Sequence, residues 1–133
     1  MDGGLCFLQL IDSISPLLGD EGSGWAIGHE VCVSVARAVD GLGPQTILVE
    51  MVQEFLNLEN PQQLIPWTYK DLEWSRMAKI ATLALRAHEK GDEVATGILE
   101  RASTRLVEYA ECVAKKMKWE DEFTLVLNGS LIT

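Results

Sequence analysis

The sequence predicts an α+β fold that is mostly helical. Five stretches carry apolar side chains at spacings of three and four, which is the pattern of amphipathic helices. One short segment near the end, Phe123–Leu127, is rich in β-forming residues and leads into a glycine turn. Hydrophobic residues make up 47% of the 133 residues, which is enough for one domain with a core of its own. We therefore expect residues 1–133 to form a single partial domain with little sheet.

The first helix is expected to begin near Ser23 and to run to about Val39. Ser23 is a good N-cap, and Gly41 accepts the left-handed geometry that ends a helix. Before this helix lies a loop of glycine and small polar residues, 19–24. The earlier apolar run Leu5–Ile11 is a strand candidate, although it is too short to separate strand from helix.

Two shorter helices are expected next. Pro44 and Thr46 should open the second helix, which reaches about Leu56 and has a broad apolar face. Asn60 and Pro61 should cap a short third helix, because proline is favoured at the first helical position.

The fourth and fifth helices are the longest expected elements. The fourth runs from about Leu72 to Glu89, and the fifth runs from its cap at Asp92 to about Lys118. Acidic residues at the start of the fifth helix and lysines at its end suit the helix dipole. One apolar stripe is expected to be its core face: Ala95, Ile98, Leu99, Ala102, Leu106, Tyr109, Ala110, Val113 and Met117.

The strand expected at Phe123–Leu127 is apolar on both faces, and such strands normally have sheet neighbours on both sides. The chain offers at most one other strand candidate, Leu5–Ile11. We therefore expect most of the sheet to be missing from this chain.

Composition and charge exclude several classes of partner. The formal net charge is −9, so the chain should repel the phosphates of nucleic acids and anionic lipid surfaces. No apolar run approaches the ~20 residues of a membrane span, and the amino terminus is a poor signal peptide. We expect no nucleic-acid partner, no membrane association and a cytoplasmic location.

The cysteines and histidines do not indicate a metal or disulfide site. Cys6, Cys32 and Cys112 are odd in number and widely spaced, which favours reduced thiols. His29 and His88 lie on separate expected helices, without the spacing of a metal pair. The four tryptophans are expected to be packing anchors.

The most informative segment is Leu17–Gly28, with the sequence LLGDEGSGWAIG. Glycines near the start of a helix let the backbone approach a ligand closely. Asp20 can accept hydrogen bonds from sugar hydroxyls. The structural alternative is that Asp20, Glu21 and Ser23 only cap the helix. The residues alone leave both interpretations open.

This segment resembles the GDEGS-G-W-x-I-G signature of the BadF/BadG/BcrA/BcrD-type ATPase family, on its N-acetylglucosamine kinase-like branch. The resemblance continues at Pro61–Tyr69, at Ala78–Asp92, at Ala95–Leu106 and at Leu125–Ser130. It covers about residues 16–133, is specific at the first segment and is diffuse elsewhere.

The resemblance implies part of an actin-like ATPase fold, in which two ribonuclease-H-like domains clasp ATP and substrate. It implies that Gly19 and Asp20 contact an amino sugar, and that the glycine turn at Gly129 and Ser130 lies near the adenosine. ATP and Mg2+ are the cofactors it implies. On this basis the chain divides into an amino-terminal segment at 1–18, whose place in the family fold stays open, a helical region at 19–118, and the terminal strand with the adenosine-type turn at 123–133.

The chain departs from the family pattern in three places. Residues 12–15 (DSIS) replace a glycine- and tryptophan-containing loop that helps to hold the sugar. Residues 1–4 (MDGG) echo the first phosphate loop, but without a preceding strand or a following threonine, so we interpret the match as chance. The second phosphate loop and the catalytic aspartate are expected before residue 1, so no catalytic residue is assigned in this chain.

The sequence therefore predicts a fragment or half of an ATP-dependent N-acetylglucosamine or hexosamine kinase that is inactive alone. The alternative is a catalytically dead remnant that acts as a helical protein-interaction module. The expected partners are the amino sugar and ATP, together with a separate amino-terminal half or a second copy of the chain. Whether the chain itself is an enzyme stays open at this stage.

Overall fold

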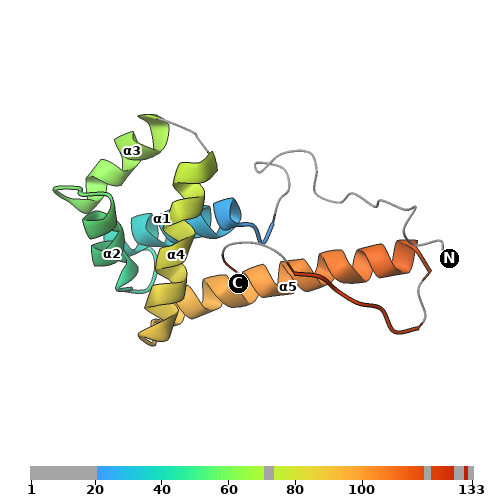
Figure 1. The fold of residues 1–133 in the computed structure, drawn as a ribbon. Helices are drawn as coiled ribbons and strands as arrows, with labels where there is room; N and C mark the ends of the chain where they lie inside the picture. The colour runs from blue at the N-terminus through green and yellow to red at the C-terminus, as the bar shows by residue number, and fades with distance from the viewer. Residues whose placement is uncertain (1–20, 71–73, 119–120, 128–130, 132–133) are drawn as a thin grey trace.

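The computed structural model describes residues 21–70, 74–118, 121–127 and 131. The described part is helical, and Figure 1 shows its helices in chain order. They are α1 (Gly24–Val39), α2 (Leu48–Phe55), the 3-10 turn η2 (Pro61–Gln63), α3 (Leu64–Lys70), α4 (Trp74–Glu89) and α5 (Glu93–Lys116).

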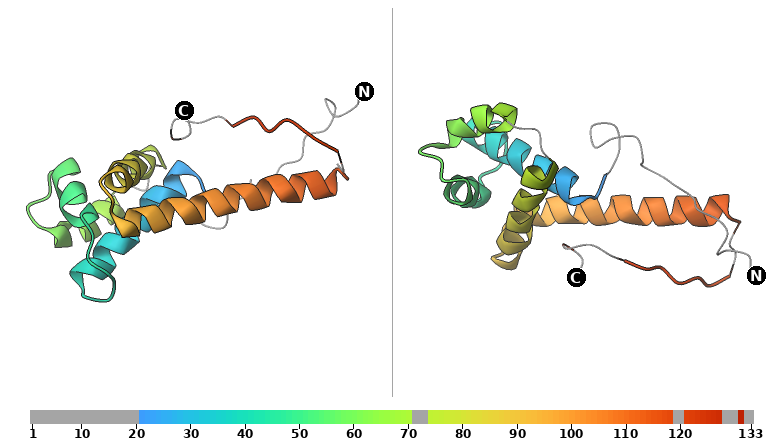
Figure 2. Two further views of the ribbon diagram at one scale, coloured as in Figure 1. Left: turned by 90° about the horizontal axis from the view of Figure 1, so that it is seen from below. Right: turned by 45° about the horizontal axis from the view of Figure 1, so that its top comes forward.

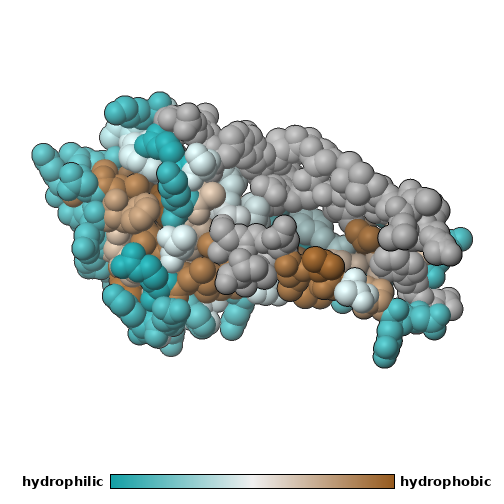
Figure 3. Space-filling model, viewed as in Figure 1, coloured by the Kyte–Doolittle hydropathy of each residue, from teal (hydrophilic) through white to brown (hydrophobic). Residues whose placement is uncertain are grey.

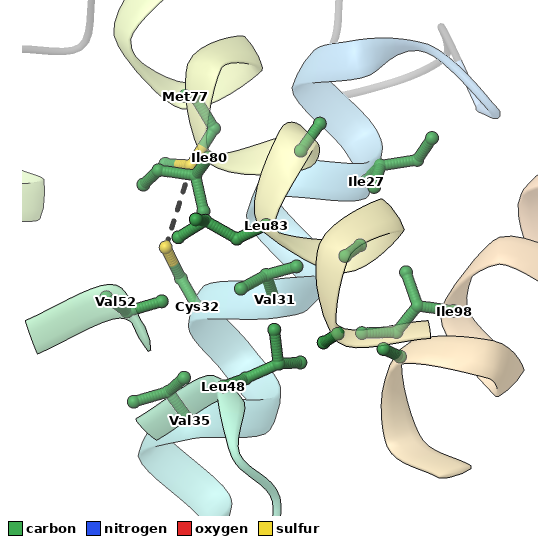
Figure 4. Close-up of a cluster of buried hydrophobic side chains, with 14 of the residues drawn as sticks. Ile27, Val31, Cys32, Val35, Leu48, Val52, Met77, Ile80, Leu83 and Ile98 are labelled. Atoms are coloured by element: carbon green, nitrogen blue, oxygen red, sulfur yellow. Dashed lines mark hydrogen bonds between the residues drawn. The ribbon is translucent and has the colours of Figure 1, made fainter. Parts of the chain in front are cut away.

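The core lies where α1 and α4 cross, and α2, α3 and the first half of α5 close it from the sides (Figure 4). Each helix contributes one apolar face, which burial removes from water. Val31, Leu48, Ile80 and Ile98 are completely buried. The full cluster is Ile27, Val31, Cys32, Val35, Leu48, Val52, Leu64, Met77, Ile80, Ala81, Leu83, Ala84, Ala87, Ala95, Ile98 and Ala102.

Gly28 allows the close approach of α1 and α4. A Cβ atom built on Gly28 would lie 1.9 Å from the carbonyl oxygen of Met77 and 2.9 Å from its carbonyl carbon. Both atoms belong to the backbone and cannot turn aside as a side chain can. Any residue with a side chain at this position would therefore push the two helices apart.

Asp92 caps two helices with one carboxylate. Its Oδ2 accepts hydrogen bonds from the backbone N–H of Ala95, at 2.9 Å, and from the hydroxyl of Thr46, at 2.7 Å. Its Oδ1 accepts the N–H of Ile47 at 3.1 Å, and the Thr46 hydroxyl in turn accepts the N–H of Leu48 at 3.1 Å. The carboxylate therefore joins the start of α2 to the start of α5 and satisfies donors that helix geometry leaves unpaired.

Several expected boundaries are confirmed and one is wrong. Ser23 caps α1 as expected, with its Oγ accepting the N–H of Ala26 at 3.1 Å, and α5 begins directly after Asp92. Pro44 does not open a helix: α2 starts only at Leu48. The reason is that the cap of α2 is built by Thr46 and the distant Asp92, which neighbouring residues alone do not reveal. The expected start of α4, Leu72, lies outside the described residues.

The expected core face of α5 is only half correct. Ala95, Ile98 and Ala102 are buried, but Leu106 is 37% exposed, and the later members of the stripe are only partly buried. The helix has 24 residues whereas α1 and α4 have 16 each, so its second half runs past them. Both views in Figure 2 show this extension. Periodicity predicted an apolar stripe, but it could not predict that, among the described residues, burial is complete only in the first half of the helix.

The strand expected at Phe123–Leu127 is not observed as a strand. Residues 121–127 are extended and exposed, and within the described part of the chain they join no β-ladder. Leu125, Val126 and Leu127 are each more than half exposed, and Figure 3 shows apolar surface where this segment runs. A strand needs a hydrogen-bonded neighbour, and no described segment provides one. The other strand candidate, Leu5–Ile11, lies outside the described residues.

Other expectations concern single side chains. Trp25 and Trp67 pack against the core, as expected of packing anchors, and the Arg76 guanidinium lies 4.5 Å from the centre of the Trp67 ring. Cys32 and Cys112 are free thiols. Among the described residues, no helix is both long and apolar enough to cross a membrane.

Cys32 makes the stability of the chain sensitive to alkaline pH. Its thiol donates to the sulfur of Met77 at 3.8 Å, and burial raises its pKa from 9.0 to about 12. Above pH 9.0 the unfolded chain loses this proton while the folded chain keeps it, so rising pH favours unfolding. We expect the unfolding free energy of the wild type to fall about 1 kcal/mol per pH unit more steeply than that of Cys32→Ala between pH 9 and pH 11. Denaturant titrations at several pH values measure both slopes, and equal slopes would contradict the buried thiol.

Candidate functional site

The described part of the signature segment begins at Glu21 and turns directly into α1. Glu21 and Gly22 form the turn, and Ser23 is the N-cap. The turn lies against the middle of α5, which places the start of α1 beside a helix that follows about eighty residues later in the chain.

Gly22 fits the turn to α5 because it has no side chain. Its φ angle is +85°, a left-handed conformation that favours glycine. A Cβ atom here would lie 2.9 Å from the carbonyl oxygen of Ala102 and 3.0 Å from the side chain of Leu106. The close approach of the protein's own backbone therefore explains why this residue is glycine. Contact with a ligand is not needed to explain it.

Two side chains of α5 hold Glu21 in place. The Tyr109 hydroxyl accepts the backbone N–H of Glu21 at 3.2 Å. The Arg105 guanidinium donates through Nε to the Glu21 carboxylate at 2.7 Å and through NH1 to the carboxylate of Glu108 at 3.0 Å. The hydrogen bond to Glu108 and the charge of Glu21 raise the pKa of Arg105 above its ordinary value. Glu21 thus serves to anchor the turn, and its carboxylate is already paired.

Leu131, near the other end of the sequence, also packs at the start of α1. Its side chain packs against the core, and its Cδ1 would lie 3.3 Å from a Cβ atom built on Gly24. The Cβ of Ala78 on α4 would lie 3.4 Å from the same point. The structure therefore brings the first turn of α1 together with the residue that follows the expected adenosine turn.

The four predicted site residues, Gly19, Asp20, Gly129 and Ser130, lie outside the described residues. Their described neighbours in sequence are Glu21 and Leu131, and both of these pack near the start of α1. The structure leaves the predicted contacts themselves untested.

Sequence reasoning missed Arg105 and Tyr109. They are spaced four residues apart on α5, a spacing that places them on one side of the helix. The apolar stripe assigns Tyr109 to the core face, and no sequence pattern points to Arg105. The positive charge of Arg105 is complementary to the acidic turn, and this is the signal that could have found these residues. More than eighty residues separate the turn from Arg105 and Tyr109 in the sequence, so the complementarity is not visible there.

The rest of the signature builds the core. Ile27 is buried, and Gly28 lies at the crossing with Met77. The rings of Trp25 and His29 stack one helical turn apart, with centroids 5.1 Å apart. Packing alone therefore explains the residue types in this half of the segment.

The described residues do not fit a magnesium site. Mg2+ prefers carboxylate oxygens and water, but among these residues no group of three or more His, Cys, Asp or Glu side chains could hold a metal ion. Glu21, the described acid of the turn, is paired with Arg105.

Comparison with known proteins relates the chain to sugar kinases. No protein-family model matches it. It is 37% identical over 121 residues to the N-acetyl-D-glucosamine kinase of Dictyostelium discoideum, in a match that covers 88% of the chain and 38% of that kinase. It is 28% identical over 107 residues to the N-acetylmuramic acid/N-acetylglucosamine kinase of Clostridium acetobutylicum, covering 80% of the chain and 35% of that kinase. The chain thus spans little more than a third of the length of these relatives.

Proposed function

We propose that the chain is part of an ATP-dependent amino-sugar kinase, which transfers the γ-phosphate of ATP to a hydroxyl of N-acetylglucosamine or a related hexosamine. The observation that carries the proposal is the 37% identity to the N-acetyl-D-glucosamine kinase. Because that match covers 88% of the chain, it includes residues 19–28 wherever it is placed. The signature segment therefore lies inside the region of similarity.

In this proposal Asp20 and the backbone of Gly19 bind the sugar. A carboxylate accepts hydrogen bonds from neighbouring hydroxyls and so can orient a sugar. The geometry of the next residue supports this role, because Glu21 is held by Arg105 and Tyr109. A residue joined to an anchored neighbour loses less freedom when it binds a ligand.

The glycine turn at Gly129 and Ser130 is proposed to contact adenosine. Support comes from Leu131, which packs beside Gly24 and Ala78 at the start of α1. This position of Leu131 supports the proposal that the two substrates bind in one region, as transfer between them requires.

Phosphoryl transfer depends on positioning and on stabilising the charge of the transferred group. When bound, ATP would supply the phosphoryl group and Mg2+ would neutralise part of its charge. What this chain contributes in the proposal is the orientation of the sugar and the placement of the adenosine. Its described residues offer neither a metal site nor an unpaired acid at the turn. We therefore assign no transfer step to them and expect the chain alone to be inactive.

Substitution of Asp20 tests the sugar site. Asp20→Asn keeps the size of the side chain but removes the charge that strengthens its hydrogen bonds. We expect binding of N-acetylglucosamine to the chain to weaken by about tenfold or more. Amide chemical shifts of Glu21, Gly22 and Gly24 report the titration. Asp121→Asn, the same change at an exposed acid of the terminal segment, is the control and should leave the affinity unchanged. Equal affinities for all three chains would remove Asp20 from the site.

A protein-interaction module is the second candidate function. The exposed apolar residues Leu125, Val126 and Leu127 favour it, because side chains of this kind can pack in a sheet formed with another chain. A separate amino-terminal half or a second copy of the chain would supply the neighbouring strand. Hydrolysis of ATP by the purified chain would exclude a role in interaction alone.

A further inference from the structure

A cavity of about 210 Å³ lies between α1, α3 and α4, away from the turn at Glu21. Buried side chains of Cys32, Leu64 and Met77 form its base. Val33 and Ile65, which are 43% and 61% exposed, stand at its mouth. The other described residues of the wall are His29, Ala36, Val39, Asp40, Pro61, Gln62 and Thr68. A hollow with an apolar base and a few polar groups on its edge has the anatomy of a small-molecule site.

Three polar side chains at the edge of the cavity form no hydrogen bond or ion pair within the described part of the chain. The side chains of His29, Asp40 and Gln62 make no hydrogen bond or ion pair with the described residues, and His29 only stacks on Trp25. The hydroxyl of Thr68, in contrast, is already engaged, because it donates to the carbonyl of Leu64 at 2.8 Å. The edge therefore offers an imidazole, a carboxylate and an amide to a ligand.

The charge around the cavity favours a cation. Asp40 is the C-cap of α1, so its carboxylate stands at the negative end of a helix of 16 residues. The described lining contains no lysine or arginine that would neutralise it. A ligand with a protonated amino group would gain from both the carboxylate and the helix end.

The size of the cavity limits the apolar part of the ligand. An apolar protein cavity of about 150 Å³ holds one benzene molecule. A volume of about 210 Å³ therefore suits one six-membered ring with a short substituent. The wall formed by α3 is held to α4 by the Arg76 guanidinium over Trp67, so the space exists before a ligand enters.

From these observations we propose that the cavity binds a small ring-bearing amine, with its ring on Leu64 and Met77 and its ammonium group at Asp40. This site is separate from the proposed sugar site, because none of its described lining residues belongs to the turn 21–24. The proposal stands or falls independently of the kinase assignment.

The test is a titration of the full chain with benzylamine, benzyl alcohol and benzoate at pH 7, followed by the methyl signals of Val33, Ile65 and Met77. We expect saturable shifts with benzylamine, weaker binding of benzyl alcohol and weakest binding of benzoate. Asp40→Asn should weaken benzylamine about tenfold at low salt, and Asp121→Asn should not. Ala36→Trp, at an exposed position of the wall, should fill the cavity and abolish binding in a folded chain.

Absence of saturable shifts with benzylamine would overturn the proposal. So would equal affinity for benzoate, or binding that survives both Asp40→Asn and Ala36→Trp. Circular dichroism shows whether each variant is folded. Titration with N-acetylglucosamine should leave the three methyl signals in place, which separates this cavity from the sugar site.

Discussion

Gly28→Ala is expected to lower the free energy of unfolding by about 3 kcal/mol, because the new methyl group would overlap the backbone of Met77. The alanine Cβ would lie 1.9 Å from the Met77 carbonyl oxygen, far inside any tolerable contact. The helices α1 and α4 must move apart to admit it, and this loosens packing around Val31 and Ile80. Thermal and denaturant unfolding measure the loss, and the midpoint temperature should fall by roughly 10 °C.

Gly97→Ala is the matched control for this prediction. Gly97 lies inside α5, and the only described atom near the position of an alanine Cβ is the end of the Arg101 side chain, 3.2 Å away. That side chain can move, so alanine should leave stability unchanged or raise it by up to about 1 kcal/mol through its better helix propensity. If both alanines stabilised the chain, the close crossing of α1 and α4 would be contradicted.

Asp92→Ala is expected to cost about 3 kcal/mol, because one carboxylate caps both α2 and α5. The substitution leaves the N–H groups of Ile47 and Ala95 without their acceptor, and it removes the partner of the buried Thr46 hydroxyl. Asp92→Asn should recover part of the loss, since an amide has one acceptor oxygen where the carboxylate has two. Chemical denaturation of the three chains measures the series.

Ser23→Ala provides the comparison with an ordinary cap. Ser23 caps α1 through one hydrogen bond to Ala26, so its loss should cost about 1 kcal/mol. If Asp92→Ala lowered the free energy of unfolding no more than Ser23→Ala does, the hydrogen bonds that link α2 to α5 through Asp92 would contribute nothing beyond a single cap.

The parts of the fold that local chemistry determines could be predicted from the sequence. Ser23 and Asp92 mark the starts of α1 and α5, because a cap acts on residues within one turn. The start of α2 could not be predicted, since it depends on a contact between Thr46 and Asp92 across 46 positions. The exposure of Leu106 was missed for a similar reason: an apolar stripe reports what a helix can bury and does not reveal where its partners end.

The candidate site, like the fold, could be predicted from the sequence only in part. The signature segment predicts a sugar site at Gly19 and Asp20, which lie outside the described residues, so this prediction stays untested. The structure gives Gly22 and Gly28 packing roles, against α5 and α4, whereas the sequence left open whether the glycines near the start of this helix approach a ligand. Arg105 and Tyr109, which hold the turn, are distant in sequence and could only be found in three dimensions.

Calorimetric titration of the purified chain with N-acetylglucosamine, in the presence of ATP and Mg2+, tests the proposed kinase role most directly. The proposal predicts a saturable heat with one sugar bound per chain, in the millimolar range expected of a site with few hydrogen bonds, ~1 mM. A chain that unfolds cooperatively and has full helical circular dichroism, but gives no saturable heat with the sugar, would contradict it.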